Sequence, residues 1–394
     1  MKKIEPLFYP DDFDRIYLKY FKKLKDENKL KYDPSGWLNT ISFSADTYLF
    51  PDVNKHTSIV PYYTDYYDQL YPFKEPIGRL LSEWDNHHFE MNEFTLCSSV
   101  TIGSLAILSM FSKSNIQNIF FETPAFYASI NQARSLGLSY QLVPTYQSEQ
   151  FKFILDFQKL SLKSPIVIWL TQPRMSLGLN QDVKHIQELY SKLPEDSYIV
   201  IDEASEQFFP SHLNAITTEK YPRIIKIRNI YKGLGINGVR MSYISHNASL
   251  REFIQREIEN FQGALDYYSL IHTENWSNNI SQFKTMLEVA NSQTKNLRID
   301  LSRTFDDEFI TFSRLVNGYV GSMSVDFSNF KSPHRINREK LLKYCFENGI
   351  SIIVGATMKF ACHEQKEFVR INFFKPRTEI ESATELISNY LKSK

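Results

Sequence analysis

Helical and extended patterns alternate through the middle of the chain. Residues 165–170 and 197–201 are nearly continuous apolar runs, which are typical of parallel strands covered on both faces. Between them, residues 183–193 space their apolar side chains as a helix does. Further strands are predicted at 94–97, 118–121, 223–228 and 239–244, with helices at 75–84, 104–111 and 127–136. This alternation predicts an α/β fold, with a large domain over residues 49–283 built on a doubly wound, mostly parallel sheet.

The pattern changes after a long helix predicted at residues 282–303. An amphipathic helical pattern also covers residues 11–25 at the N-terminus. The C-terminal part is predicted to hold strands at 319–327, 350–354 and 368–374, and helices at 337–347 and 379–391. We therefore expect a smaller α+β domain, formed by residues 1–48 together with 284–394.

Composition and charge exclude several classes of protein. Lys+Arg (45) and Asp+Glu (45) balance across 394 residues, so bulk charge predicts neither a nucleic-acid partner nor an anionic membrane. Apolar runs fall short of the roughly 18 residues that span a membrane, and the start lacks a secretory signal. Cys97, Cys345 and Cys362 lack disulfide or metal spacing, and His87 and His88 are adjacent. We expect no metal site and a reducing, cytoplasmic compartment.

A glycine-rich stretch follows the strand predicted at 223–228. Residues 233–238 match the spacing G-x-G-x-x-G of dinucleotide-binding loops. That fingerprint must open a helix, because the pyrophosphate sits on the helix N-terminus. Here it leads into an extended pattern, which argues against a nucleotide site. What remains is Lys232 after a strand, a loop loosened by glycines, and Arg240 eight residues later (240 − 232 = 8).

This arrangement resembles the fold-type I pyridoxal-phosphate-dependent enzymes, the aspartate aminotransferase superfamily that includes the class I and II aminotransferases. In that family a lysine carries the cofactor and an arginine eight residues later binds its phosphate. Further segments resemble family motifs in the family's order; they start at Thr101, Thr123, Ile201, Val354 and Phe368. The joint order over residues 101–372 carries the resemblance, since each segment alone is weak.

The resemblance implies roles for residues of this chain. Lys232 would form a Schiff base with pyridoxal 5'-phosphate and move a proton on the substrate, which requires a deprotonated amine. Asp202 would keep the ring nitrogen protonated. Arg370 would bind the substrate α-carboxylate through its planar guanidinium. The expected cofactor-binding residues are Asp202, Phe126, Gly103, Ser104, Asn229, Arg240, Ser205 and Tyr67.

Three positions depart from the family pattern, and one of them is Asn229, where the family has a phosphate-binding serine or threonine. Met175 stands where the family has an asparagine that donates to the cofactor's ring oxygen, and Ser205 stands where a tyrosine often serves the same oxygen. Losing both donors predicts that the imine proton is held more tightly. Gln172 or Arg174 would offset that loss if either side chain turned toward the cofactor, and a rearranged loop is the other explanation.

The sequence predicts a cytoplasmic, homodimeric aminotransferase that acts on an α-amino acid and a 2-oxo acid, with no nucleic-acid or membrane partner. Tyr66 or Tyr67 is expected to reach the partner's phosphate site, and a purely aromatic interface is the alternative. A pyridoxal-phosphate-dependent decarboxylase or lyase on the same scaffold stays open. So does a catalytically degenerate relative that binds the cofactor without turnover. Residues 227–232 are similar to a motif of histidinol-phosphate aminotransferases and threonine-phosphate decarboxylases.

Overall fold

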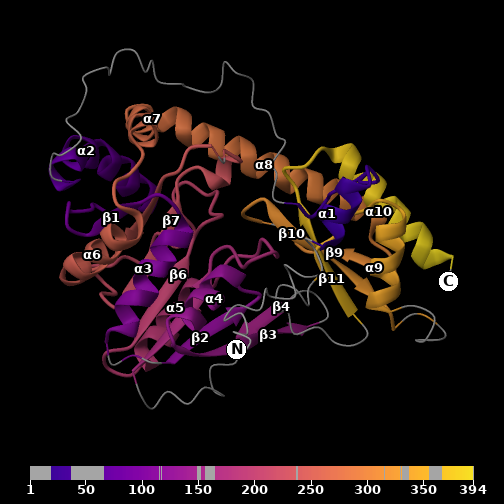
Figure 1. The fold of residues 1–394 in the computed structure, drawn as a ribbon, viewed down its shortest axis with the longest axis horizontal. Coiled ribbons are helices and arrows are strands. Elements are labelled where there is room, and N and C mark those ends of the chain that lie inside the picture. The colour runs from indigo at the N-terminus through magenta and orange to yellow at the C-terminus, as the bar shows by residue number, and fades with distance from the viewer. Residues whose placement is uncertain are drawn as a thin grey trace, which may run out of the picture.

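The structure is a computed structural model that describes residues 19–36, 66–114, 116, 118–148, 152–155, 165–236, 238–314, 316–328, 330, 337–354 and 366–393. Within these residues it contains one eight-stranded sheet and one three-stranded sheet, joined by a long helix (Figure 1). Part of the predicted N-terminal helix, residues 11–18, lies outside the described residues.

The large sheet has the strand order β1-β8-β7-β6-β5-β2-β3-β4. Its strands are β1 (Phe94–Cys97), β2 (Asn118–Thr123), β3 (Ser139–Ser148), β4 (Lys152–Leu155), β5 (Ile166–Thr171), β6 (Tyr198–Asp202), β7 (Ile224–Asn229) and β8 (Ser242–Ser245). Strands β2, β3, β5, β6 and β7 pair in parallel, which confirms the predicted fold class. Strands β1, β4 and β8 are antiparallel to their neighbours.

Strand β8 runs antiparallel to β7, with Asn229 opposite Ser242, and the glycine-rich loop between them returns the chain beside β7. Strands β5, β6 and β7 pair in parallel. Their carboxyl ends therefore meet at one edge of the sheet, where ligands bind in open α/β folds.

Helices cover both faces of the large sheet. They are α2 (Tyr66–Asp85), α3 (Val100–Ser112), α4 (Tyr127–Ser135), α5 (Val183–Lys192), α6 (Arg251–Gln262), α7 (Tyr267–Ser277) and α8 (Ile280–Phe305). Alternate strand residues face opposite ways: Trp169 and Val200 are buried with residues of α3, α4 and α6, and Ile168 and Ile201 with residues of α5. Helices α2, α7 and α8 bury Trp84, among others, against β1 and β8.

The second sheet belongs to a smaller unit at the C-terminal end. Its antiparallel strands, in the order β11-β10-β9, are β9 (Ile310–Phe312), β10 (Val320–Asp326) and β11 (Lys366–Asn372). Helices α9 (Arg338–Glu347) and α10 (Arg377–Lys392) contribute to one core with these strands. Helix α1 (Lys19–Asp26) packs on the same unit, with the Tyr20 and Phe346 rings 4.9 Å apart. Helix α8 runs from the large sheet to this unit (Figure 1).

Two predicted elements differ in the structure, and the structure contains a hairpin that was not predicted. Helix α3 begins at Val100, four residues before the predicted start, because Ser99 caps it. The hairpin of β3 and β4 was not predicted. Residues 350–354, predicted as a strand, make only isolated bridges, from Ile350 to Tyr32 and from Val354 to Val369. A short apolar run alone does not reveal whether a partner strand lies beside it.

Candidate active site

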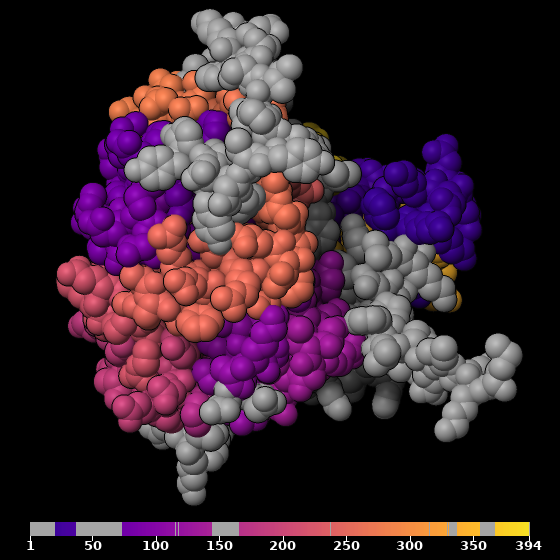
Figure 2. Space-filling view, turned by 60° about the vertical axis from the view of Figure 1, so that its left-hand side comes forward, coloured from indigo at the N-terminus to yellow at the C-terminus, as the bar shows by residue number. Residues whose placement is uncertain are grey.

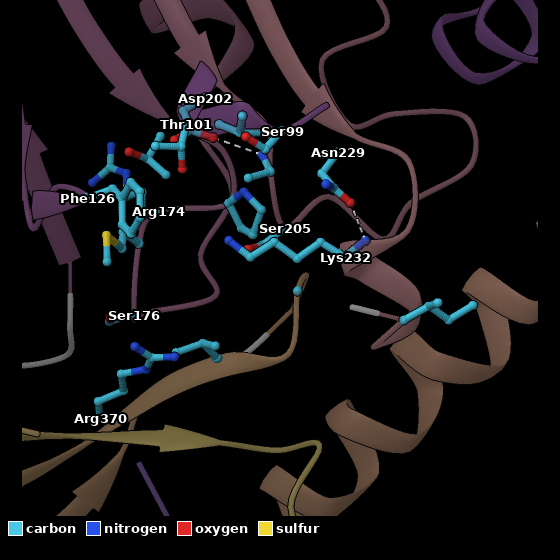
Figure 3. A pocket seen from close by; sticks show the side chains of 18 of the residues that line it. Ser99, Thr101, Phe126, Arg174, Ser176, Asp202, Ser205, Asn229, Lys232 and Arg370 are labelled. Carbon is cyan, nitrogen blue, oxygen red and sulfur yellow. Dashed lines mark hydrogen bonds between the residues drawn. The ribbon is translucent and has the colours of Figure 1, made fainter. Parts of the chain in front are cut away.

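A cavity of about 180 Å³ opens at the carboxyl ends of β5, β6 and β7, where the two sheets approach each other (Figure 3). Its walls come from elements far apart in the sequence, including β6, the turn after β7, β10 and β11. Seven of the ten residues predicted for the site line it: Phe126, Asp202, Ser205, Asn229, Lys232, Arg240 and Arg370. Gly103 and Ser104 do not belong to this set.

Lys232 begins a three-residue 3-10 turn directly after β7. The side chain of Asn229 builds this turn, because its Oδ1 accepts the backbone N–H groups of Tyr231 at 2.9 Å and Lys232 at 2.6 Å. Gly235 ends the turn with a φ of 73°, a left-handed conformation that glycine adopts without strain. The Nζ atom of Lys232 lies 5.9 Å from the centre of the Phe126 ring. The local sequence thus presents the lysine amine to the cavity beside an aromatic wall.

Asp202 ends β6 and is buried at the cavity wall. Its Oδ1 accepts the backbone N–H of Ala204 at 2.9 Å, the bond drawn in Figure 3. Burial raises the pKa of Asp202, and the positive charge of Lys232 opposes that rise. A carboxylate withdrawn from water is stabilised by a cationic partner, so this wall favours a ligand that presents a protonated nitrogen.

The N-terminus of α3 forms another part of the wall. Ser99, Val100 and Thr101 line the cavity, and Ser99 caps the helix by accepting from the N–H of Ile102 at 3.2 Å. No acidic residue lies in the first turn, so the positive end of the helix dipole is not neutralised there. Arg240 lines the same cavity. Together these groups suit an anion such as a phosphate.

The structure places Gly103 and Ser104, which were predicted to hold a phosphate, about one turn beyond the start of α3. Because α3 starts earlier than predicted, both residues lie inside the helix and are buried. A Cβ at Gly103 would meet the side chains of Ile227 at 3.2 Å and Cys97 at 3.3 Å, so this glycine allows the helix to pack on the sheet. Tyr67 lies near the start of α2, and its side chain is outside what the structure describes.

Arg370 reaches the cavity from the smaller unit. It lies in the middle of β11, opposite Ser322 of β10, and its side chain is fully buried. Its backbone N–H donates to Ile353 at 2.9 Å, and its carbonyl accepts from the Ser35 hydroxyl. The antiparallel pairing therefore fixes the direction in which the guanidinium points. Figure 3 shows it on the side of the cavity formed by this sheet.

The loop after β5 holds Met175, one of the departures from the family pattern, together with Gln172 and Arg174. Arg174 lines the cavity but is largely buried, with its Nε 3.5 Å from the carboxylate of Glu122 and one Nη donating to Gln181 at 3.2 Å. Burial raises the pKa of Glu122, and Arg174 opposes that rise. Gln172 is absent from the cavity wall, because its amide donates to Asn180 at 2.8 Å instead. Met175 and Ser205 line the cavity.

Two of the three cysteines lie within the described residues, and both are buried free thiols. Burial raises the pKa of Cys97 to about 12 and that of Cys345 still further. In the same part of the chain, no three His, Cys, Asp or Glu side chains form a group that could hold a metal ion. No helix there combines the length and apolarity needed to cross a membrane.

Comparison with known proteins identifies the family. Residues 63–387 match the family described as aminotransferase class I and II. The chain belongs to this family. Among its relatives is histidinol-phosphate aminotransferase from Buchnera aphidicola subsp. Diuraphis noxia, which is 23% identical to this chain over 174 residues. That alignment covers 44% of this chain and 48% of the relative, so it spans about half of the relative's length.

Several solved structures share the fold of this protein. Aspartate aminotransferase from Thermotoga maritima superposes with a TM-score of 0.76 at 15% identity, covering 98% of both chains. Cystalysin from Treponema denticola, whose crystal structure contains pyridoxal 5'-phosphate, superposes with a TM-score of 0.76 at 13% identity, covering 100% of this chain and 99% of its own. These findings confirm the predicted type I fold and the predicted family.

Several cavity residues were missed in the sequence. Ser99 had a usable signal, because a serine between a strand and an apolar helical run is a common N-cap. Ile236 and Val239 belong to the loop already singled out for its glycines. Gly318 had no such signal, because it reaches the cavity only when the smaller unit packs on the large sheet.

Proposed function

We propose that this protein is a pyridoxal 5'-phosphate-dependent aminotransferase that transfers an amino group between an α-amino acid and a 2-oxo acid. The observation that carries the proposal is the convergence of Lys232, Asp202 and Arg370 on one cavity. An amine nucleophile, a buried acid and a planar carboxylate-binding cation are the groups that this chemistry needs. Membership of the class I and II aminotransferase family supports the same activity.

The chemistry of the cavity wall fits pyridoxal 5'-phosphate. Arg240 and the positive N-terminal end of α3 suit its phosphate. Asp202 suits the protonated ring nitrogen, because a cation there would compensate a buried carboxylate. Phe126 offers an aromatic face within reach of Lys232. When bound, the cofactor supplies an aldehyde that condenses with amines and a ring that withdraws electrons.

Each residue then has a defined task. Lys232 would hold the cofactor through Nζ, and its free amine would act as the general base for the proton on the substrate Cα. Asp202 would accept a hydrogen bond from the protonated ring nitrogen of the cofactor. Arg370 holds the substrate carboxylate by paired hydrogen bonds, which fixes Cα relative to Nζ. The buried setting of Asp202 and Arg370 excludes water from these contacts.

Trapping and product analysis test this function. The protein is incubated with pyridoxal 5'-phosphate, reduced with borohydride and digested, and we expect the label on Lys232 and its loss in Lys232→Ala. Lys184→Arg, at an exposed position of α5, is the control and should label like wild type. A panel of amino acids should then yield 2-oxo acids. Release of CO2 or ammonia instead would favour a decarboxylase or lyase, and label on another lysine would refute the assignment.

We also propose that the protein is a cytoplasmic homodimer. Phe261 of α6 and Tyr267 and Tyr268 of α7 are each 38–39% exposed, and Figure 2 shows these two helices on one face of the molecule. Aromatic residues are enriched at protein interfaces. The buried thiols Cys97 and Cys345 suit a reducing compartment. Light scattering should give twice the monomer mass, and replacing both tyrosines with glutamate should give the monomer.

A further inference from the structure

Two buried side-chain amides connect the smaller unit to the turn that carries Lys232. Gln207 and Asn317 are fully buried, and neither is part of the cavity wall. The backbone N–H of Gln207 donates to Asn317 Oδ1 at 2.9 Å, and Gln207 Nε2 donates to the carbonyl oxygen of Gly233 at 2.6 Å. Gly233 directly follows Lys232. The connection therefore ends one residue from the reactive lysine.

Asn317 is held from several directions. Its Nδ2 donates to Glu206 Oε1 at 2.6 Å and to Asn180 Oδ1 at 2.9 Å. Its backbone N–H donates to the carbonyl of Gly178 at 3.1 Å. The side-chain oxygen and nitrogen of Asn317 are both satisfied, whereas Gln207 Oε1 accepts no bond within the described residues. A buried amide held in this way is rigid. Asn317 thus anchors the loop after β6 to the loop after β5.

The turn of Lys232 lies directly against the anchored loop. A Cβ at position 233 would lie 2.6 Å from the backbone oxygen of Glu206, so glycine allows this close approach. The turn also has its own bonds, from Lys232 N–H to Asn229 and from Gly235 N–H to the Lys232 carbonyl at 3.0 Å. Gln207 adds a side-chain bond across the contact, between the turn and the loop that follows Asp202.

We propose that Gln207, held by Asn317, is a positioning residue that sets the direction of the Lys232 side chain. This inference rests on the proposed function, because it concerns a reaction carried by Lys232. Nζ lies at the end of a long side chain, so a small rotation of the turn moves Nζ much further than the backbone. A misplacement of about 1 Å can cost about 10²-fold in rate. The Gln207 bond to the Gly233 carbonyl opposes such a rotation.

The test changes Gln207 while keeping its size. Gln207→Glu retains the shape but sets an oxygen against the Gly233 carbonyl, and Gln207→Met removes the donor without adding charge. The matched control is Gln187→Glu on α5, where Nε2 donates to the Tyr221 hydroxyl at 2.9 Å, outside the cavity. Each protein is loaded with pyridoxal 5'-phosphate. The measurements are kcat and KM with an amino donor that wild type uses, the pH midpoint of the visible absorbance, and Tm.

We expect both Gln207 variants to bind the cofactor, to shift the pH midpoint, and to lower kcat by at least about tenfold while KM changes by less than about threefold. The control should match wild type in kcat, in KM and in the pH midpoint. Either Gln207 variant that folds and keeps the wild-type kcat and pH midpoint would overturn the proposal, even if its Tm fell. If wild-type protein took up no cofactor, the proposed function itself would fail, and this inference with it.

Discussion

Asp202 and Lys232 face one cavity from the ends of two neighbouring parallel strands. Strand β6 ends at Asp202, and β7 ends at Asn229, three residues before Lys232 (232 − 229 = 3). The positive charge of Lys232 opposes the rise in pKa that burial imposes on Asp202. A buried acid and a nearby amine are thus held together by the register of the sheet rather than by a local sequence motif.

The first prediction concerns the stability of the cofactor-free protein. Because burial raises the pKa of Asp202, the folded state binds its proton more tightly than the unfolded chain does. The carboxyl therefore favours folding fully only below its unfolded pKa of about 3.9, and that contribution is lost as pH rises through the folded pKa. At pH 7 we therefore expect Asp202→Asn to be more stable than wild type, with a free energy of unfolding higher by on the order of 1 kcal/mol.

Urea unfolding of cofactor-free wild type and Asp202→Asn over a pH series checks this. The difference between the two proteins should shrink as the pH falls toward 4, because protonated aspartic acid and asparagine carry the same charge. A difference that stays constant with pH, or that favours wild type at pH 7, would contradict the assigned cause.

Arg370→Lys should weaken substrate binding rather than cofactor binding. Lysine keeps the charge but cannot form two parallel hydrogen bonds to a carboxylate. A charged hydrogen bond contributes about 1.5–3 kcal/mol, so kcat/KM should fall roughly 10- to 100-fold. The measurement is steady-state kinetics beside a titration with pyridoxal 5'-phosphate, whose affinity should stay unchanged. Loss of cofactor affinity with an unaltered KM would place Arg370 elsewhere in the mechanism.

Gly318→Ala should destabilise the protein and narrow the cavity. Gly318 has a φ of +77°, and a Cβ there would lie 2.8 Å from a side-chain carbon of Pro173 and 3.1 Å from the backbone oxygen of Ser205. The matched control is Gly137→Ala, because Gly137 has a φ of +74° with no heavy atom within 4 Å of the added Cβ. Both variants should lose about 1–2 kcal/mol from the left-handed backbone.

Gly318→Ala should lower the free energy of unfolding by more than the control does, and it alone should bind pyridoxal 5'-phosphate less tightly. Thermal unfolding and cofactor titration of the two variants together make the comparison. Equal losses in both would mean that the contact with Pro173 and Ser205 relaxes without consequence.

Met175→Asn should lower the pH midpoint of the visible absorbance of cofactor-bound protein. The family resemblance assigns Met175 and Ser205 to the positions of two ring-oxygen donors, and Gln172 and Arg174 direct their polar groups to other residues. A new amide donor would stabilise the ring oxygen as an anion, so the imine proton would leave at lower pH. Met175→Leu adds no donor and should leave the midpoint unchanged. Equal midpoints in the Asn and Leu variants would argue against this role.

Much of the fold was predictable because apolar runs such as residues 165–170 and 197–201 are strong, local signals. The start of α3 was harder: the helical pattern was visible, but its first turn depends on the Ser99 cap, so the predicted start was four residues late. The β3–β4 hairpin and the bridges at residues 350–354 depend on which strands meet, which a short window does not record.

The sequence by itself determined the family, the lysine with its arginine eight residues later, and the acid at the end of β6, because each follows from spacing along a continuous segment. The tertiary structure decided which of these groups share a cavity. It brought Arg370 and Gly318 to the cavity at the edge of the large sheet and turned Arg174 toward Glu122. It also placed the Gln207 amide in hydrogen-bond contact with the turn that carries Lys232. Contacts between distant segments depend on how the two sheets pack, and packing is a property of the whole folded chain.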